Sequence, residues 1–178
     1  ALEKEMKGYA AELEKSESVA GIVNTSSSLI PYTTLPVSKT VFPRDIQNAL
    51  DSVSVGSVKG PYLNASDNTY NVIKLIATTQ APDSVQYRAI NCANVSLDAA
   101  KNTADSIIKA VAAGAKFEDI AKKYNQPAES QWLTAAQYEG QNLDADNTKF
   151  IKAILNGTPN AVQKVDLAQN VVVIEVLA

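Results

Sequence analysis

Residues 85–124 read VQYRAINCANVSLDAAKNTADSIIKAVAAGAKFEDIAKKY, and this stretch organises our interpretation of the whole chain. The mostly apolar residues 85–92 predict a strand that is largely covered on both faces. Apolar side chains then recur at steps of three and four from Leu97 to Ala112, which predicts a helix that ends near Gly114. A second, shorter helix is expected over 116–124. The stretch therefore predicts the order strand, helix, helix.

The composition restricts the classes of function that need consideration. The chain has 178 residues, of which 46% are hydrophobic and 20% charged, with a net charge of −3, so it is long enough for one domain or two small ones. It has no basic run for nucleic acid and no apolar run long enough to cross a bilayer. It contains no histidine, which excludes His-based acid–base catalysis and His metal ligation. Cys92 is the only cysteine, and the carboxylates lack metal-ligand spacing, so no disulfide, metal or cofactor is expected.

The first half of the chain predicts helices followed by a hairpin. A helix is expected over 2–20, an ordered but irregular segment over 24–43, and a short helix over 43–51. Two apolar, alternating segments then flank a polar turn at Asn64–Asn68, which predicts a hairpin. Ala81–Pro82–Asp83 interrupts the pattern, and we place a boundary between two units there.

The end of the chain repeats this arrangement. A helical turn over 135–138, capped by Thr134, is followed by a helix over 148–156, by Gly157 and by a second hairpin whose returning strand covers 171–177. Helix, glycine, strand, turn and strand thus occur twice. The sequence predicts two degenerate copies of one unit, over 1–82 and 83–178, and the first copy lacks an evident opening strand.

The strand pattern V-x-x-R-x-I, the helix after it and the segment GAKFEDIAKKYN resemble the opening of a parvulin domain. Parvulins are peptidyl-prolyl cis-trans isomerases, also called rotamases. The whole chain is similar to periplasmic folding factors of the SurA and PpiD type. The resemblance implies an α+β fold with two tandem parvulin-like units, each a small, mostly antiparallel sheet packed with helices. It also implies that the chain is a piece of a longer protein with further domains.

The resemblance places the family's site on five residues of this chain. The opening and closing histidines of the parvulin pattern fall on Ala89 and Val172, and no catalytic residue is assigned, so the sequence leaves enzyme activity undecided. The candidates for lining a peptide groove are Ala89, Trp132, Tyr138, Phe150 and Val172. In the alternative interpretation, Trp132 and Phe150 are core residues, and Tyr124 and Tyr138 are the exposed rings.

The favoured function is therefore a catalytically degenerate, chaperone-type module that binds unfolded or proline-containing polypeptide segments. The location that the resemblance implies is the periplasm or cell envelope, with an inner-membrane anchor outside this piece. One alternative is a weakly active isomerase that uses hydroxyl groups and backbone donors. Another is an architectural spacer that positions other domains of the parent protein.

Overall fold

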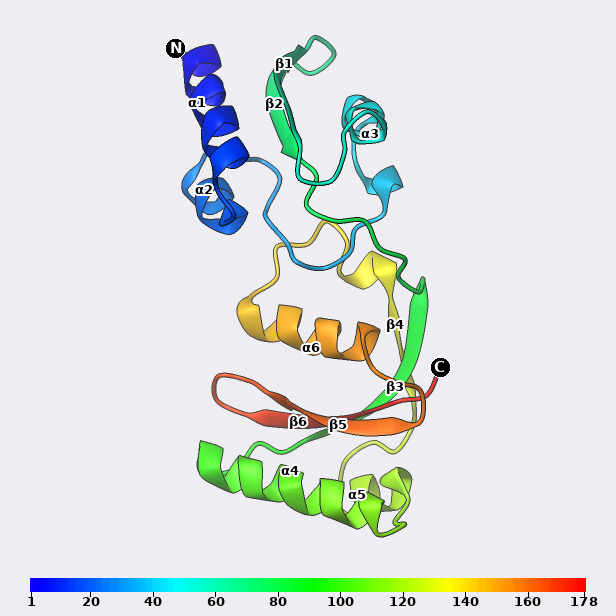
Figure 1. The fold of residues 1–178 in the computed structure, drawn as a ribbon. Coiled ribbons are helices and arrows are strands. Elements are labelled where there is room, and N and C mark those ends of the chain that lie inside the picture. The colour runs from blue at the N-terminus through cyan, green and yellow to red at the C-terminus, as the bar shows by residue number, and fades with distance from the viewer. The chain divides into compact units, whose positions relative to one another are not determined.

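A computed structural model describes residues 1–178 and divides them into two compact units. The first unit comprises Ala1–Gln80 with Glu139–Asn142, and the second comprises Ala81–Tyr138 with Leu143–Ala178. Each unit combines helices with a small antiparallel sheet, as the α+β prediction requires (Figure 1). No helix is both long enough and apolar enough to span a membrane.

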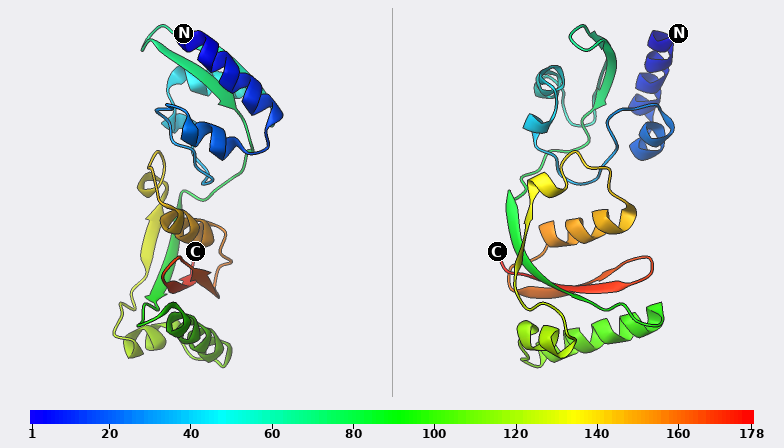
Figure 2. Two further views of the ribbon diagram at one scale, coloured as in Figure 1. Left: turned by 90° about the vertical axis from the view of Figure 1, so that its left-hand side faces the viewer. Right: turned by 180° about the vertical axis from the view of Figure 1, so that it is seen from behind.

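The first unit is a two-stranded sheet between helices. Its elements are α1 (Leu2–Lys15), α2 (Val19–Thr25), the 3-10 helix η1 (Lys39–Val41), α3 (Arg44–Asp51), β1 (Val58–Asn64) and β2 (Thr69–Lys74). Helix α1 packs on both strands of the hairpin, and α3 lies on the opposite face (Figures 1 and 2). The hairpin turn lies at 65–68, as predicted, and Asn68 adopts a left-handed φ of 57°.

One prediction for the first unit is wrong. Residues 2–20 form two helices, because the chain leaves α1 at Ser16, whose backbone is extended. The Ser16 hydroxyl oxygen accepts the Ser18 backbone N–H at 3.0 Å, a local bond that competes with continuing the helix. The segment 24–43 contains η1 and no strand.

The second unit is a four-stranded antiparallel sheet in the order β4-β3-β6-β5. Its elements are β3 (Ser84–Asn91), α4 (Leu97–Ala112), α5 (Phe117–Lys123), β4 (Gln131–Thr134), η2 (Ala135–Gln137), α6 (Ala145–Leu155), β5 (Ala161–Asp166) and β6 (Val171–Val176). Helices α4 and α5 cover one face of the sheet, and α6 covers the other (Figures 1 and 2). The predicted neighbours β3 and β6 are paired, with Ala89 opposite Ile174 and Asn91 opposite Val172.

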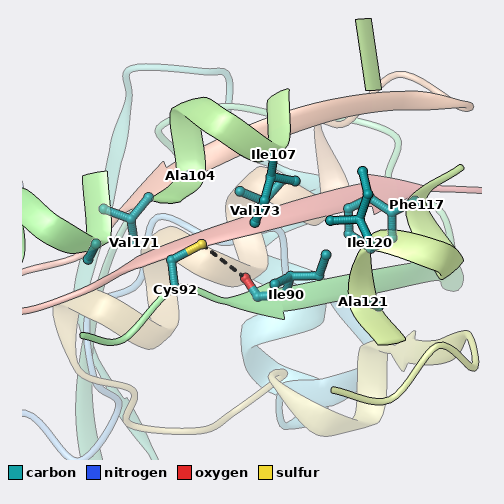
Figure 3. Close-up of a cluster of buried hydrophobic side chains, with 10 residues drawn as sticks. Ile90, Cys92, Ala104, Ile107, Phe117, Ile120, Ala121, Val171 and Val173 are labelled. Carbon is teal, nitrogen blue, oxygen red and sulfur yellow. Dashed lines mark hydrogen bonds between the residues drawn. The ribbon is translucent and has the colours of Figure 1, made fainter. Parts of the chain in front are cut away.

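The main core lies between the sheet and the α4–α5 layer (Figure 3). Ile90, Val171 and Val173 are fully buried there and meet Ile107 of α4 and Phe117 of α5. Each such aliphatic side chain contributes about 1.5–3 kcal/mol by leaving water. The apolar run 171–176 is therefore a central strand, as its β-branched residues predict.

Arg88 joins the sheet to α5 at the margin of this core. Its guanidinium contacts Glu118 at 2.9 Å and Glu175, its cross-strand partner, at 3.1 Å, and the Arg88 side chain is only 20% exposed. The Glu118 carboxylate accepts a hydrogen bond from the Glu118 backbone N–H, which lowers the pKa of that carboxyl, and the charge of Arg88 lowers the pKa further. These ion pairs hold β3 to its neighbouring strand β6 and to the helix α5 that covers it.

Candidate functional site

A hollow of about 380 Å³ lies on the α6 face of the four-stranded sheet. Strand alternation places Ala89 and Asn91 of β3 and Val172 of β6 on that face, while their neighbours Ile90 and Val173 point into the main core. Helix α6 contributes Phe150. The complete lining is Ala89, Asn91, Gln126, Pro127, Glu129, Gln131, Asp146, Asn147, Phe150, Leu167, Asn170 and Val172.

The apolar part of the hollow is formed by the sheet and α6. Ala89 and Val172 are diagonal neighbours across β3 and β6, and their alkyl groups stand where the parvulin pattern has imidazoles. The Phe150 ring packs against Tyr87 in an edge-to-face arrangement, with centroids 5.9 Å apart and planes at 77°. Burial raises the pKa of Tyr87, so its phenol stays protonated at neutral pH. This part of the hollow is suited to an apolar ring and has no group that exchanges a proton near pH 7.

Carboxamides form much of the polar rim. Gln126 binds the backbone of Asn91 with both of its side-chain atoms: Oε1 accepts the Asn91 N–H at 2.7 Å, and Nε2 donates to the Asn91 carbonyl at 2.5 Å. Asn170 donates from Nδ2 to the Asn91 side-chain oxygen at 2.6 Å. The Asn170 Oδ1 atom is buried without a partner. These bonds hold the end of β3, at the cost of one buried oxygen without a hydrogen bond.

The charged part of the lining is acidic. Glu129 and Asp146 line the hollow, and none of its lining residues is basic. Asp146 accepts the Ala168 backbone N–H at 3.1 Å, which ties the first turn of α6 to the β5–β6 connection. The Asn147 side chain beside it has no hydrogen-bond partner within the chain. The rim therefore offers carboxylate and amide groups to a ligand.

The structure brings three of the five predicted groove residues together. Ala89, Phe150 and Val172 line the hollow, whereas Trp132 and Tyr138 do not. Trp132 pairs with Gln86, and the preceding residue of β4, Gln131, lines the hollow, so the Trp132 side chain lies on the opposite face of the sheet.

The expected exposures of these two aromatic residues are wrong. Trp132 is 53% exposed, which excludes the alternative that it is a core residue, because β4 is an edge strand. Tyr138 is only 4% exposed and is not a surface ring; it directly follows η2 and is part of the core. Tyr124, at 39% exposure, is a surface ring as predicted.

The sequence did not reveal the carboxamide residues of the rim. Gln126 and Asn170 come from the segment after α5 and from the β5–β6 turn, and they meet at Asn91 only in the folded chain. Cys92 lies outside the site: its thiol is buried in the main core, donates weakly to the Ile90 carbonyl at 3.7 Å, and has its pKa raised by burial (Figure 3). It is a small core residue, as its strand position predicts.

Comparison with known proteins identifies the family of the second unit. The sequence model described as "PPIC-type PPIASE domain" matches residues 70–178, which include β2 of the first unit except its first residue and the whole of the second unit. No curated protein and no solved structure matches the chain.

Proposed function

The chain belongs to the family of PPIC-type peptidyl-prolyl cis-trans isomerase domains, and from this premise we propose that it is a catalytically degenerate member that binds unfolded, proline-containing segments as a chaperone-type module. The family implies proline-containing polypeptides as ligands. The side chains of the hollow support the proposal that the chain binds such segments without isomerising them.

Isomerisation faces a barrier of about 20 kcal/mol, because the imide bond has partial double-bond character. An enzyme lowers this barrier by binding the twisted amide more tightly than the planar one, with polar groups directed at the reacting atoms. In this hollow the two strand positions that match the histidines of the parvulin pattern carry only alkyl groups, at Ala89 and Val172. This observation carries the proposal: the apolar floor for a proline ring is present, and the two imidazoles of the family pattern are absent.

The remaining polar groups suit binding of an extended chain. The Asn147 side chain, which has no hydrogen-bond partner within the chain, provides one donor group and one acceptor at the edge of the apolar floor. Both kinds of group complement peptide N–H and C=O groups without regard to side-chain identity. A hollow of about 380 Å³ is large enough for a few residues rather than for a folded partner.

An isomerisation assay on a proline-containing tetrapeptide tests the degeneracy. We expect the rate with the full 178-residue chain to equal the uncatalysed rate, and the variant Phe150→Ala to leave it unchanged. Acceleration well above background that disappears in Phe150→Ala would instead establish the alternative, a weakly active isomerase. Trp132→Phe, on the other face of the sheet, is the matched control.

Chemical-shift mapping with an unfolded proline-rich peptide tests binding. We expect the side-chain amide signals of Asn147 and Asn170 to shift, the Trp132 indole signal to stay in place, and Phe150→Ala to weaken binding about tenfold or more through loss of the ring's buried contact. If no signal anywhere in the chain shifts at millimolar peptide, the module is an architectural spacer. A double variant, Ala89→His with Val172→His, adds a gain-of-function arm, in which isomerisation above background would show that only the side chains are missing.

The cell envelope is the proposed location, because the folding factors that the chain resembles work on unfolded polypeptides there. Cell fractionation of the parent protein is the corresponding test, and recovery in the cytosol would contradict it.

A further inference from the structure

Strand β2 of the first unit has an outer edge with unpaired backbone groups. In an antiparallel pair, alternate residues direct their N–H and C=O groups toward the partner strand. Leu75 accepts the Gly56 N–H at 2.6 Å and donates to the Ser57 carbonyl at 3.3 Å, so it faces β1, as do the residues two and four positions before it.

The alternate residues Tyr70, Val72 and Lys74 therefore direct their backbone groups away from β1. None of these outward N–H and C=O groups is hydrogen-bonded to another part of the chain. Every residue of β2 is only half-buried, as expected of a strand with one neighbour. An edge with three such residues in succession is a template for an added strand.

The second unit shows what lies along the corresponding edge. Apart from the additional strands β3 and β4, its elements follow the order of the first unit: a long helix, a seven-residue helix, a 3-10 helix, a helix and a hairpin. In the hairpins, Val176 accepts the Asn160 N–H as Leu75 accepts that of Gly56, so β6 corresponds to β2. The edge of β6 carries β3: the Val171 carbonyl accepts the Cys92 N–H, and Leu177 donates to Gln86.

We propose that the outer edge of β2 binds an extended segment of an unfolded client polypeptide, antiparallel to β2, in the position that β3 takes on β6. The assignment of a client as the occupant rests on the proposed function, whereas the free edge itself does not. The site lies in the first unit and shares no residue with the hollow.

Charge arrangement favours an occupant of variable sequence over one fixed strand. In the second unit, Glu175 forms an ion pair with Arg88 of β3, so the resident strand is held by a specific side chain. Lys74 takes the place of Glu175 on β2, but its ammonium donates to the Leu13 and Ser16 carbonyls at the end of α1, at 2.8 and 2.9 Å. An incoming strand would therefore be bound through backbone hydrogen bonds and would need no partner charge for Lys74.

Amide hydrogen exchange on the full chain tests the proposal, with the peptide SVQYRAIN, the sequence of residues 84–91, as the probe. In the free protein we expect fast exchange at Tyr70, Val72 and Lys74 and slow exchange at Leu75. Saturating peptide should slow exchange at the first three residues at least tenfold. A scrambled peptide of the same composition should do the same, and a peptide methylated on every backbone nitrogen should not.

The variant Val72→Pro removes one outward N–H and leaves the β1 pairing in place, because proline is tolerated where an edge N–H faces solvent. We expect it to weaken SVQYRAIN binding by about tenfold, with Leu75 still protected and binding of the proline-rich peptide to the hollow unchanged. Phe150→Ala should show the reverse pattern, so that failure of the hollow and failure of the edge are distinguishable.

Three results would overturn the proposal. The first is unchanged exchange at Tyr70, Val72 and Lys74 with millimolar peptide. The second is equal protection by the fully methylated peptide, which would indicate side-chain binding elsewhere. The third is protection in the free protein that disappears on dilution, which would show that a second copy of the chain occupies the edge.

Discussion

The two units share an order of helices that ends in a hairpin, but the sheet of the first unit has two strands and that of the second has four. In the second unit, β6 lies between β3 and β5, and all but one of its residues are buried. In the first unit, the equivalent strand β2 has one neighbour and no buried residue. A strand with a neighbour on each side thus removes more apolar surface from water than an edge strand does.

The presence or absence of a neighbouring strand also determines the partners of one charged residue in each hairpin. Glu175 has a cross-strand partner in Arg88, because β3 is present. Lys74 has no such neighbour and instead satisfies the carbonyls at the end of α1. A cation at a helix C-terminus is favoured both by the unpaired carbonyls and by the helix dipole. The smaller sheet is thus stabilised within its own unit.

Substitutions in the two cores should give the largest effect. Ile90→Ala removes a fully buried side chain beneath α4 and α5, and we expect it to lower the free energy of unfolding of the second unit by about 4 kcal/mol. Ile46→Ala, at 6% exposure in the first unit, should cost about 2–3 kcal/mol. Urea unfolding followed by the fluorescence of Trp132 reports the second unit. An equal shift of that signal by both variants would contradict the separation into two units.

The glycine at the start of each hairpin should give the next largest difference. A Cβ on Gly157 would overlap Val176, so we expect Gly157→Ala to destabilise the second unit by about 2–3 kcal/mol. Gly56 has open space around it but a φ of +87°, so Gly56→Ala should cost only about 1 kcal/mol, from backbone strain. Thermal unfolding of both variants checks the order, and a larger effect at Gly56 would reverse it.

The charged residues of the paired hairpins should differ less. We expect Arg88→Met to cost about 1–2 kcal/mol, because it leaves the largely covered Glu175 unpaired. Lys74→Met should cost about 1 kcal/mol through loss of the bonds to α1. Lys7→Met, in an exposed pair with Glu3, is the control and should be near neutral. Urea midpoints that do not separate Arg88→Met from the control would show that the ion pairs of Arg88 add no stability.

Alkaline pH should destabilise the first unit slightly, through Tyr62. Burial, together with the hydrogen bond to Asp45, raises the pKa of Tyr62 from 10.0 to about 12. Since the folded pKa lies above the unfolded one, the contribution of Tyr62 is complete below pH 10 and is lost as pH rises toward 12. Tyr62→Phe should remove this loss from the circular-dichroism transition. An unchanged alkaline transition in the variant would assign the effect to another group.

Much of the fold could be predicted from periodicity alone. The strand near 85–92, the helices near 97–112 and 117–123 and both hairpins lie where the apolar spacing indicates, because each is long enough for its pattern to stand out. The sequence does not predict strand β4, because a pattern of polar and apolar residues over only four positions, QWLT, cannot be distinguished from a turn. The break at Ser16 was missed because a serine side chain, and no proline or glycine, ends α1.

The candidate site, like the fold, was predictable from the sequence only in part. The sequence by itself determined that no imidazole is available, because that is a matter of composition. Its resemblance to the parvulin pattern pointed to Ala89, Phe150 and Val172, which line the hollow. Only the tertiary structure decided that Trp132 lies on the other face, that Tyr138 is buried, and that Gln126 and Asn170 meet at Asn91. Those outcomes depend on which strand pairs with which, and hydrogen bonds between residues far apart in the chain form only after the sheet has brought them together.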